Sequence, residues 1–144
     1  MPATRSCEVF IDGASRGNPG PSGIGAVFYA GGAAPVKQLS QPLGQTTNNV
    51  AEYLACIYAL QDALQQGYSA VTVKTDSELL VRQLSGQYKV RDPLLRLFHD
   101  LVVHLIQGFD RCAVTHVPRT QNRVADRLAG EAADRVKAAQ QLAH

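Results

Sequence analysis

Four carboxylates in this sequence occupy positions at which an active site could form. Asp12 and Asp76 each follow a short apolar or β-branched segment, while Glu52 and Asp126 fall in the first turns of two expected helices. Strand ends and helix starts meet at one edge of an α/β sheet, where ligand sites usually form. We therefore expect these four side chains to converge at such an edge.

Convergence of four acids would constrain their chemistry. Carboxylates at close range repel one another and cannot all stay ionised without cations. Ligation by oxygen alone suits Mg²⁺, with Mn²⁺ as a substitute. Two such ions about 3.5–4 Å apart can stabilise both the attacking and the leaving oxygen of an in-line phosphoryl displacement. The pattern therefore indicates phosphodiester chemistry.

Taken one at a time, each acid also has an ordinary structural interpretation. Asp12 precedes a glycine and fits a turn. Glu52 could complete a capping box with Asn49, and Asp76 could cap the helix that follows it. Asp126 could be a solvated helix residue between two arginines. Position in the sequence alone leaves these alternatives open.

The elements that must position these acids follow two hydrophobic periods. Runs of β-branched and apolar residues predict strands, and apolar residues at helical spacing predict helices. Hairpins imply antiparallel pairing of the first three strands, and strand–helix–strand steps imply parallel pairing afterwards. We expect an α/β fold with a mixed five-stranded sheet flanked by helices. The expected strands are about 7–12, 24–30, 35–42, 71–75 and 112–117, and the expected helices about 52–66, 77–84, 93–107 and 122–139.

Composition fits one domain over residues 1–144, with an ordered core over about residues 5–138. Hydrophobic residues make up 45% of the chain, yet no apolar run approaches the ~20 residues that span a bilayer. The first residues lack the apolar stretch of a secretory signal. We expect a cytoplasmic monomer with no membrane partner. The net charge of +2 permits a polyanionic partner without requiring one.

The three cysteines, Cys7, Cys56 and Cys112, are widely spaced and form no C-x-x-C pair. We expect reduced, buried thiols that pack in the interior rather than a metal site or a disulfide.

Four blocks of sequence carry a family resemblance. They are residues 11–25 (IDGASRGNPGPSGIG), 46–53 (TTNNVAEY), 75–77 (TDS) and 122–129 (NRVADRLA). In this order, and over nearly the whole chain, they resemble type 1 ribonuclease H of the ribonuclease H-like superfamily. The resemblance implies the ribonuclease H-like fold, with three antiparallel strands followed by two parallel ones.

The resemblance also implies an activity. The chain would be an endonuclease that hydrolyses the RNA strand of RNA–DNA hybrids, giving 5′-phosphate and 3′-hydroxyl products. Asp12, Glu52, Asp76 and Asp126 would hold two Mg²⁺ ions, with Mn²⁺ as a possible substitute. One ion would activate the attacking water and the other would steady the leaving oxygen.

Further residues acquire roles by resemblance. Substrate contacts are expected from Gly13, Ala14, Asn18, Thr47, Asn48 and Glu78, with Thr47 at a DNA phosphate. Glycine allows a close approach of the backbone, and backbone N–H groups can contact the 2′-hydroxyls that distinguish RNA from DNA. The asparagine and threonine residues could equally serve turns and helix caps.

His116 lies ten residues before Asp126. In many family members, a loop histidine at that offset assists proton transfer or product release. Here it is expected inside the last strand, with no glycine-rich loop, so that both a catalytic and a structural role stay open.

The chain also departs from many family members in its basic surface. A basic helical protrusion grips the hybrid in those members, whereas residues 87–93 are short and only mildly basic. The pattern resembles a compact subgroup of the family that is found in archaea and some bacteria. Some members of that subgroup also cut RNA–RNA duplexes. Double-stranded RNA is therefore an alternative substrate. A catalytically silent nucleic-acid-binding domain is a second alternative, which the presence of all four acids disfavours.

Overall fold

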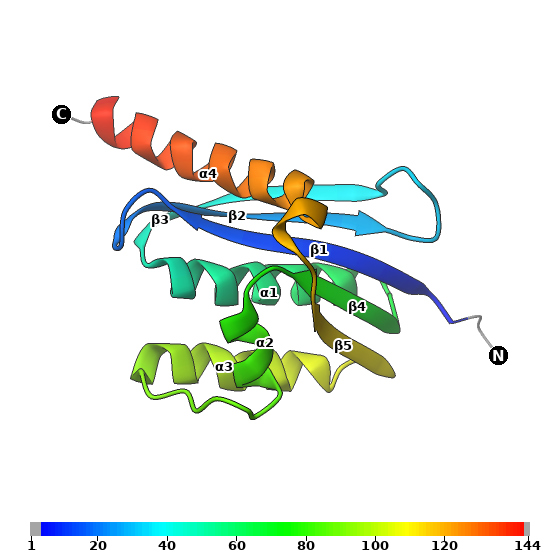
Figure 1. Cartoon of the computed structure of the whole chain (residues 1–144). Helices are drawn as coiled ribbons and strands as arrows, with labels where there is room; N and C mark the ends of the chain where they lie inside the picture. The colour runs from blue at the N-terminus through cyan, green and yellow to red at the C-terminus, as the bar shows by residue number, and fades with distance from the viewer. Residues whose placement is uncertain (1–3, 143–144) are drawn as a thin grey trace.

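The computed structural model describes residues 4–142, which form a five-stranded sheet between layers of helix (Figure 1). The strand order is β3-β2-β1-β4-β5. β1 pairs antiparallel with β2, and β2 with β3, whereas β4 runs parallel to both β1 and β5. The expected mixed sheet is therefore confirmed. The strands are β1 (Ser6–Ser15), β2 (Gly20–Tyr29), β3 (Lys37–Thr46), β4 (Ala70–Thr75) and β5 (Arg111–His116).

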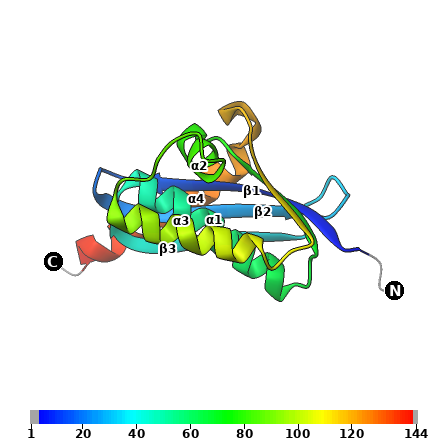
Figure 2. The ribbon, with the colours of Figure 1, turned by 90° about the horizontal axis from the view of Figure 1, so that it is seen from below.

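Helices cover the two faces of the sheet unequally. On one face α1 packs directly on the strands and α3 lies outside it, as Figure 2 shows from below, while α4 crosses the opposite face. Their bounds are α1 (Asn48–Gln65), α2 (Glu78–Leu84), α3 (Pro93–Ile106) and α4 (Arg123–Leu142), with a short 3₁₀ turn, η1 (Arg119–Gln121), before α4. Within residues 4–142, no helix is both long and apolar enough to cross a membrane.

The core lies between the sheet and α1. Alternate residues of β1, such as Val9 and Ile11, point to this face and are fully buried, as are Phe28 of β2 and Leu60 of α1. Burial of one such side chain stabilises the fold by roughly 1.5–3 kcal/mol. The strands that carry the candidate acids are therefore fixed by packing on their α1 face.

The first strand is longer than expected. The sequence predicted that this strand ends at Asp12, at the start of a turn, but β1 keeps pairing with β2 until Ser15 lies opposite Ser22. The reason is Gly13, where any Cβ would overlap the backbone of α1 at Ala51 and Glu52. This glycine allows a helix to approach the strand rather than allowing a turn, and the turn shrinks to residues 16–19.

The three cysteines are free thiols, as expected. Cys7 and Cys56 are buried, but Cys112 is only half-buried, because β5 is an edge strand. Burial raises the pKa of the Cys7 thiol and of the Cys112 thiol to about 11. Thiols with such pKa values stay protonated and weakly nucleophilic at neutral pH.

Candidate active site

Three of the four predicted acids meet at the carboxyl end of the parallel strands. Oxygen atoms of Asp12, Glu52 and Asp76, one from each carboxylate, lie within 4.8 Å of one another. The parallel pairing of β1 with β4 ends where Ile11 lies opposite Thr75. The residue that follows each of these two positions is an acid, Asp12 or Asp76. Glu52 joins them because α1 lies close against the backbone at Gly13.

The fourth acid, Asp126, is the fourth residue of α4 and is half-buried. Its carboxylate lines the same cleft as the other three acids. The negative charge of Asp126 adds to the effect of burial in raising the pKa of Asp12. Asn122 fixes the start of this helix, since its Nδ2 donates a 2.8 Å hydrogen bond to the carbonyl oxygen of Ile11. The four acids thus come from β1, the residue that follows β4, and two helices.

The acids line an open cleft of about 580 Å³. Its other walls come from β1, the start of α1, the start of α2 and the segment that follows β5. The remaining lining residues are Gly13, Ala14, Ser15, Arg16, Asn48, Ser77, Glu78, His116, Pro118 and Arg119.

Electrostatics make this cluster suited to cations. Burial, and then the charges of Glu52 and Asp76, raise the pKa of Asp12 well above its ordinary value of 3.8. Burial and the charge of Asp76 likewise raise the pKa of Glu52. Glu52 also keeps one oxygen, Oε2, buried without a hydrogen-bond partner within residues 4–142. An oxygen-only donor set with raised pKa values and an unpaired buried oxygen fits a hard divalent cation.

The ordinary structural interpretations of three acids are contradicted. Asp12 lies in the body of a strand rather than in a turn. Thr47, not Asn49, caps α1, so Glu52 completes no capping box there. Ser77, not Asp76, caps α2. Because no local role accounts for these three acids, their convergence is the feature that needs a functional explanation.

The expected substrate residues divide into two groups. Gly13, Ala14, Asn48 and Glu78 line the cleft. Asn18 and Thr47 lie beside it and act within the fold: Asn18 Oδ1 accepts a 3.1 Å hydrogen bond from the N–H of Asn48, and Thr47 Oγ1 accepts one of 3.3 Å from Val50. Both contacts satisfy free N–H groups at the start of α1.

His116 is the last residue of β5, in agreement with its expected place in a strand, and it is exposed. That terminal position also puts it in the lining of the acidic cleft. A strand position and a cleft position are therefore compatible here.

Two residues that were not among the predicted site residues take part in the site in the structure. Arg119 lines the cleft from η1. Asn122 is 1% exposed and ties α4 to β1. An asparagine directly before a helix is a usable signal, but it predicts a local cap rather than a contact across 111 residues of chain.

A five-stranded sheet with this strand order and an acidic cluster across β1, α1 and β4 defines the ribonuclease H-like class of fold. Residues 10–132 match the family described as reverse transcriptase-like. The chain belongs to this family, with type 1 ribonucleases H among its relatives. The connection between α2 and α3, residues 85–92, is short, as in the expected compact form.

Two curated proteins and one solved structure illustrate the similarity. Ribonuclease HI of Halobacterium salinarum is 43% identical over 127 residues, which are 88% of this chain and 64% of that protein. The bifunctional protein Rv2228c of Mycobacterium tuberculosis is 44% identical over 124 residues, 85% of this chain but 34% of that protein. The chain thus spans less than two thirds of these relatives. The crystal structure of LC11-RNase H1 in complex with RNA/DNA hybrid superposes with a TM-score of 0.84 at 40% identity, covering 90% of this chain and 97% of that one.

Proposed function

We propose that this chain is a metal-dependent endoribonuclease that hydrolyses the RNA strand of RNA–DNA hybrids in its acidic cleft. The observation that carries the proposal is the convergence of Asp12, Glu52 and Asp76 within 4.8 Å. The relatives named ribonuclease H and the hybrid complex of LC11-RNase H1 support the choice of substrate.

Asp12, Glu52, Asp76 and Asp126 would hold two Mg²⁺ ions, with Mn²⁺ as a substitute. Bound there as a pair, such ions would supply the positive charge needed to activate a water for attack on phosphorus and to offset the charge on the leaving oxygen. The four carboxylates fix where the scissile phosphate lies, and their own charge is offset only when cations are bound. Water would form a new bond to phosphorus while the bond from phosphorus to O3′ breaks, which leaves a 5′-phosphate on one product and a 3′-hydroxyl on the other.

Substrate contacts would come from the walls of the cleft. Gly13 and Ala14 line the cleft, and their backbone groups would recognise a ribose 2′-hydroxyl there. Thr47 and Asn48 stand at the N-terminus of α1, where the helix dipole favours a phosphate, and Asn18 holds that end of the helix in place. Glu78 lines the cleft from the start of α2 and would contact the hybrid there.

His116 would assist proton transfer or product release. Its ring stands at the end of β5 in the lining of the cleft that contains the four acids. All four acids come from one chain, which supports a monomeric catalyst. A cytoplasmic location stays a prediction from the sequence.

The decisive experiment uses an RNA–DNA hybrid labelled on each strand, beside matched RNA–RNA and DNA–DNA duplexes. Each is incubated with Mg²⁺, Mn²⁺ or EDTA. We expect cleavage of the RNA strand of the hybrid, dependence on a divalent ion and a 5′-phosphate on the product. Comparable cleavage of the RNA–RNA duplex would broaden the substrate to double-stranded RNA. Hybrid binding without cleavage in either metal would contradict the enzymatic proposal and favour a binding domain.

A further inference from the structure

Asn122 joins the two elements that carry Asp12 and Asp126. Its side-chain Nδ2 donates to the carbonyl oxygen of Ile11, the residue directly before Asp12, at 2.8 Å. Its backbone carbonyl accepts a 3.0 Å hydrogen bond from the N–H of Asp126. One residue therefore connects the backbone next to one candidate ligand with the backbone of another.

We infer that Asn122 is a positioning residue that holds Asp126 in register with Asp12 and so sets the affinity of the cluster for divalent cations. This inference rests on the proposed function, because it assumes that the four acids bind metal.

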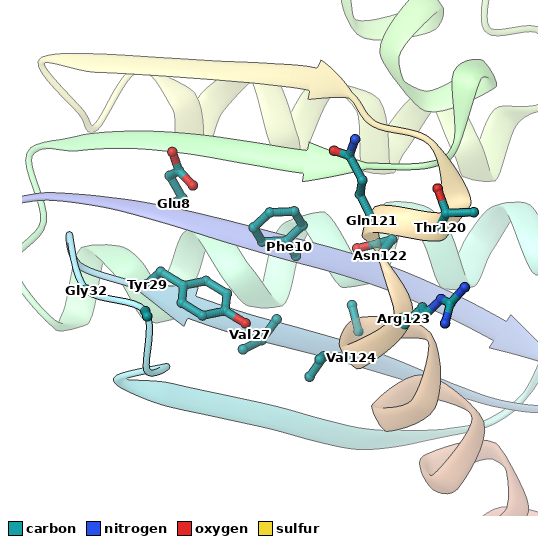
Figure 3. A pocket seen from close by; sticks show the side chains of 12 residues that line it. Glu8, Phe10, Val27, Tyr29, Gly32, Thr120, Gln121, Asn122, Arg123 and Val124 are labelled. Atoms are coloured by element: carbon teal, nitrogen blue, oxygen red, sulfur yellow. The ribbon is translucent and has the colours of Figure 1, made fainter.

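The surroundings of Asn122 argue against a purely structural role. The residue is 1% exposed and sits on the sheet beside Phe10, at the wall of a shallow pocket of about 350 Å³ (Figure 3). Its Oδ1 is buried and has no hydrogen-bond partner within the part of the chain that the structure describes. Burying an unpaired polar atom lowers stability, so an apolar side chain of the same size would serve packing at least as well. The property that only the amide supplies is the bond to Ile11.

The rest of α4 is held to the sheet without Asn122. Ser40 of β3 donates a 2.7 Å hydrogen bond from Oγ to the carbonyl of Leu128, and Arg16 pairs with Asp134 at 2.9 Å. Gly25 of β2 lies against the helix backbone at Ala125. The Ser40 and Arg16 contacts dock the helix beyond its first turn, whereas Asn122 and the Gly25 contact act at the first turn, where Asp126 stands, and of these two only Asn122 also bonds to the backbone next to Asp12.

The test compares Asn122→Leu with Ser40→Ala. The first keeps a branched side chain of similar shape but removes the bond to Ile11, and the second removes a bond from the sheet to α4 outside the cleft. Mn²⁺ alone is titrated into each protein, with free ion followed by electron paramagnetic resonance. Because residues that orient metal ligands typically contribute 10–100-fold to metal affinity, we expect Asn122→Leu to weaken Mn²⁺ binding by roughly that factor. Ser40→Ala should keep the wild-type affinity even if it melts earlier.

Steady-state kinetics provide a second readout. In Asn122→Leu the Mg²⁺ concentration for half-maximal cleavage should rise, while KM for the hybrid at saturating Mg²⁺ stays within about twofold of wild type. If Asn122→Leu does not fold, Asn122→Ala gives the same test, because it needs no extra space.

Wild-type Mn²⁺ affinity in a folded Asn122 variant would overturn the inference. An equal loss of Mn²⁺ affinity in Ser40→Ala would also overturn it, because the cause would then be a general loosening of α4. Asp12→Asn separates this failure from failure of the proposed function. If Asp12→Asn loses Mn²⁺ and the Asn122 variant does not, only the positioning role is wrong. If Asp12→Asn binds Mn²⁺ like the wild type, the metal centre itself is wrong.

Discussion

The hydroxyl of Tyr53 donates a 2.6 Å hydrogen bond to Oε1 of Gln83, and both side chains are buried. Tyr53 follows Glu52 on α1, and Gln83 lies on α2, the helix that follows Asp76. The side-chain amide of Gln83 in turn donates a 3.4 Å hydrogen bond to the carbonyl oxygen of Lys89. These hydrogen bonds link α1, which carries Glu52, to α2, which follows Asp76. They also link both helices to the short connection between α2 and α3.

Removing this hydroxyl in Tyr53→Phe should lower the free energy of unfolding by about 1–3 kcal/mol, because the oxygen of Gln83 is left buried and unpaired. Urea unfolding measures the change. Tyr58→Phe is the control, since Tyr58 is on the same helix, is half-buried and makes no side-chain hydrogen bond among the described residues. Equal stability of the two variants would show that the Tyr53–Gln83 bond contributes nothing net.

Asp12→Asn should abolish cleavage and leave the fold intact. Without metal, this variant should also be more stable than the wild type, by at least about 1 kcal/mol, because it removes a buried carboxylate whose raised pKa signals unfavourable ionisation. Thermal unfolding in EDTA checks the stability, and the labelled hybrid checks the activity. Normal turnover by Asp12→Asn would exclude Asp12 as a metal ligand.

The stability of the metal-free protein should fall as pH rises. Burial and neighbouring charge raise the pKa values of Asp12 and Glu52 in the folded state, so the folded protein holds these protons more tightly than the unfolded chain. Stability from this source is complete below the unfolded values near 4 and is lost as pH rises toward the folded pKa values. Unfolding in EDTA at pH 5, 6.5 and 8 should show the decline, which Asp12→Asn should reduce.

Metal binding should release protons for the same reason. Ligands must be deprotonated to bind a cation, so Mg²⁺ affinity should increase with pH over this range. Calorimetry in two buffers of different ionisation enthalpy counts the protons. Metal affinity that does not change between pH 5 and 8 would contradict the raised pKa values.

Gly25→Ala should destabilise the protein by roughly 1–3 kcal/mol or more, because the new methyl would overlap the backbone of α4 at Ala125 and Ala129. The helix must shift, and Asp126 with it, so cleavage should fall as well. Gly32→Ala is the matched control, since a Cβ there meets nothing within 4 Å. Both variants are compared by urea unfolding and by initial rate.

His116→Ala should lower kcat by about 10²-fold, the usual size of a proton-transfer contribution, with little change in KM for the hybrid. His104→Ala, an exposed histidine on α3, should behave like the wild type. A rise in KM with unchanged kcat would instead make His116 a substrate contact.

Much of the fold could be predicted because its signals are local. Runs of β-branched and apolar residues indicated the strands, helical spacing indicated α1 and α4, and Pro93 indicated the start of α3. The acids were predicted from ordered blocks of sequence. The extent of β1 was not predictable, because the pairing beyond Asp12 depends on α1 docking against Gly13, a contact between distant segments.

The same limit applies within the site. Capping of α1 by Thr47 rather than Asn49 depends on where β3 ends, and the tie from Asn122 to Ile11 exists only once α4 crosses β1. Single-sequence patterns report which residue types recur at which spacing. They do not report which backbone group a buried amide will meet.

The burial of Asp12 and Glu52 at the floor of an open cleft also dictates how the complex assembles. Without cations, any ionised carboxylate there repels the phosphates of an incoming strand. In the proposed nuclease, cation and polyanion should therefore bind with positive cooperativity. By thermodynamic reciprocity, the factor by which hybrid tightens cation binding equals the factor by which cation tightens hybrid binding. The ion concentration that half-saturates the free protein must accordingly exceed the concentration that half-saturates its complex with hybrid.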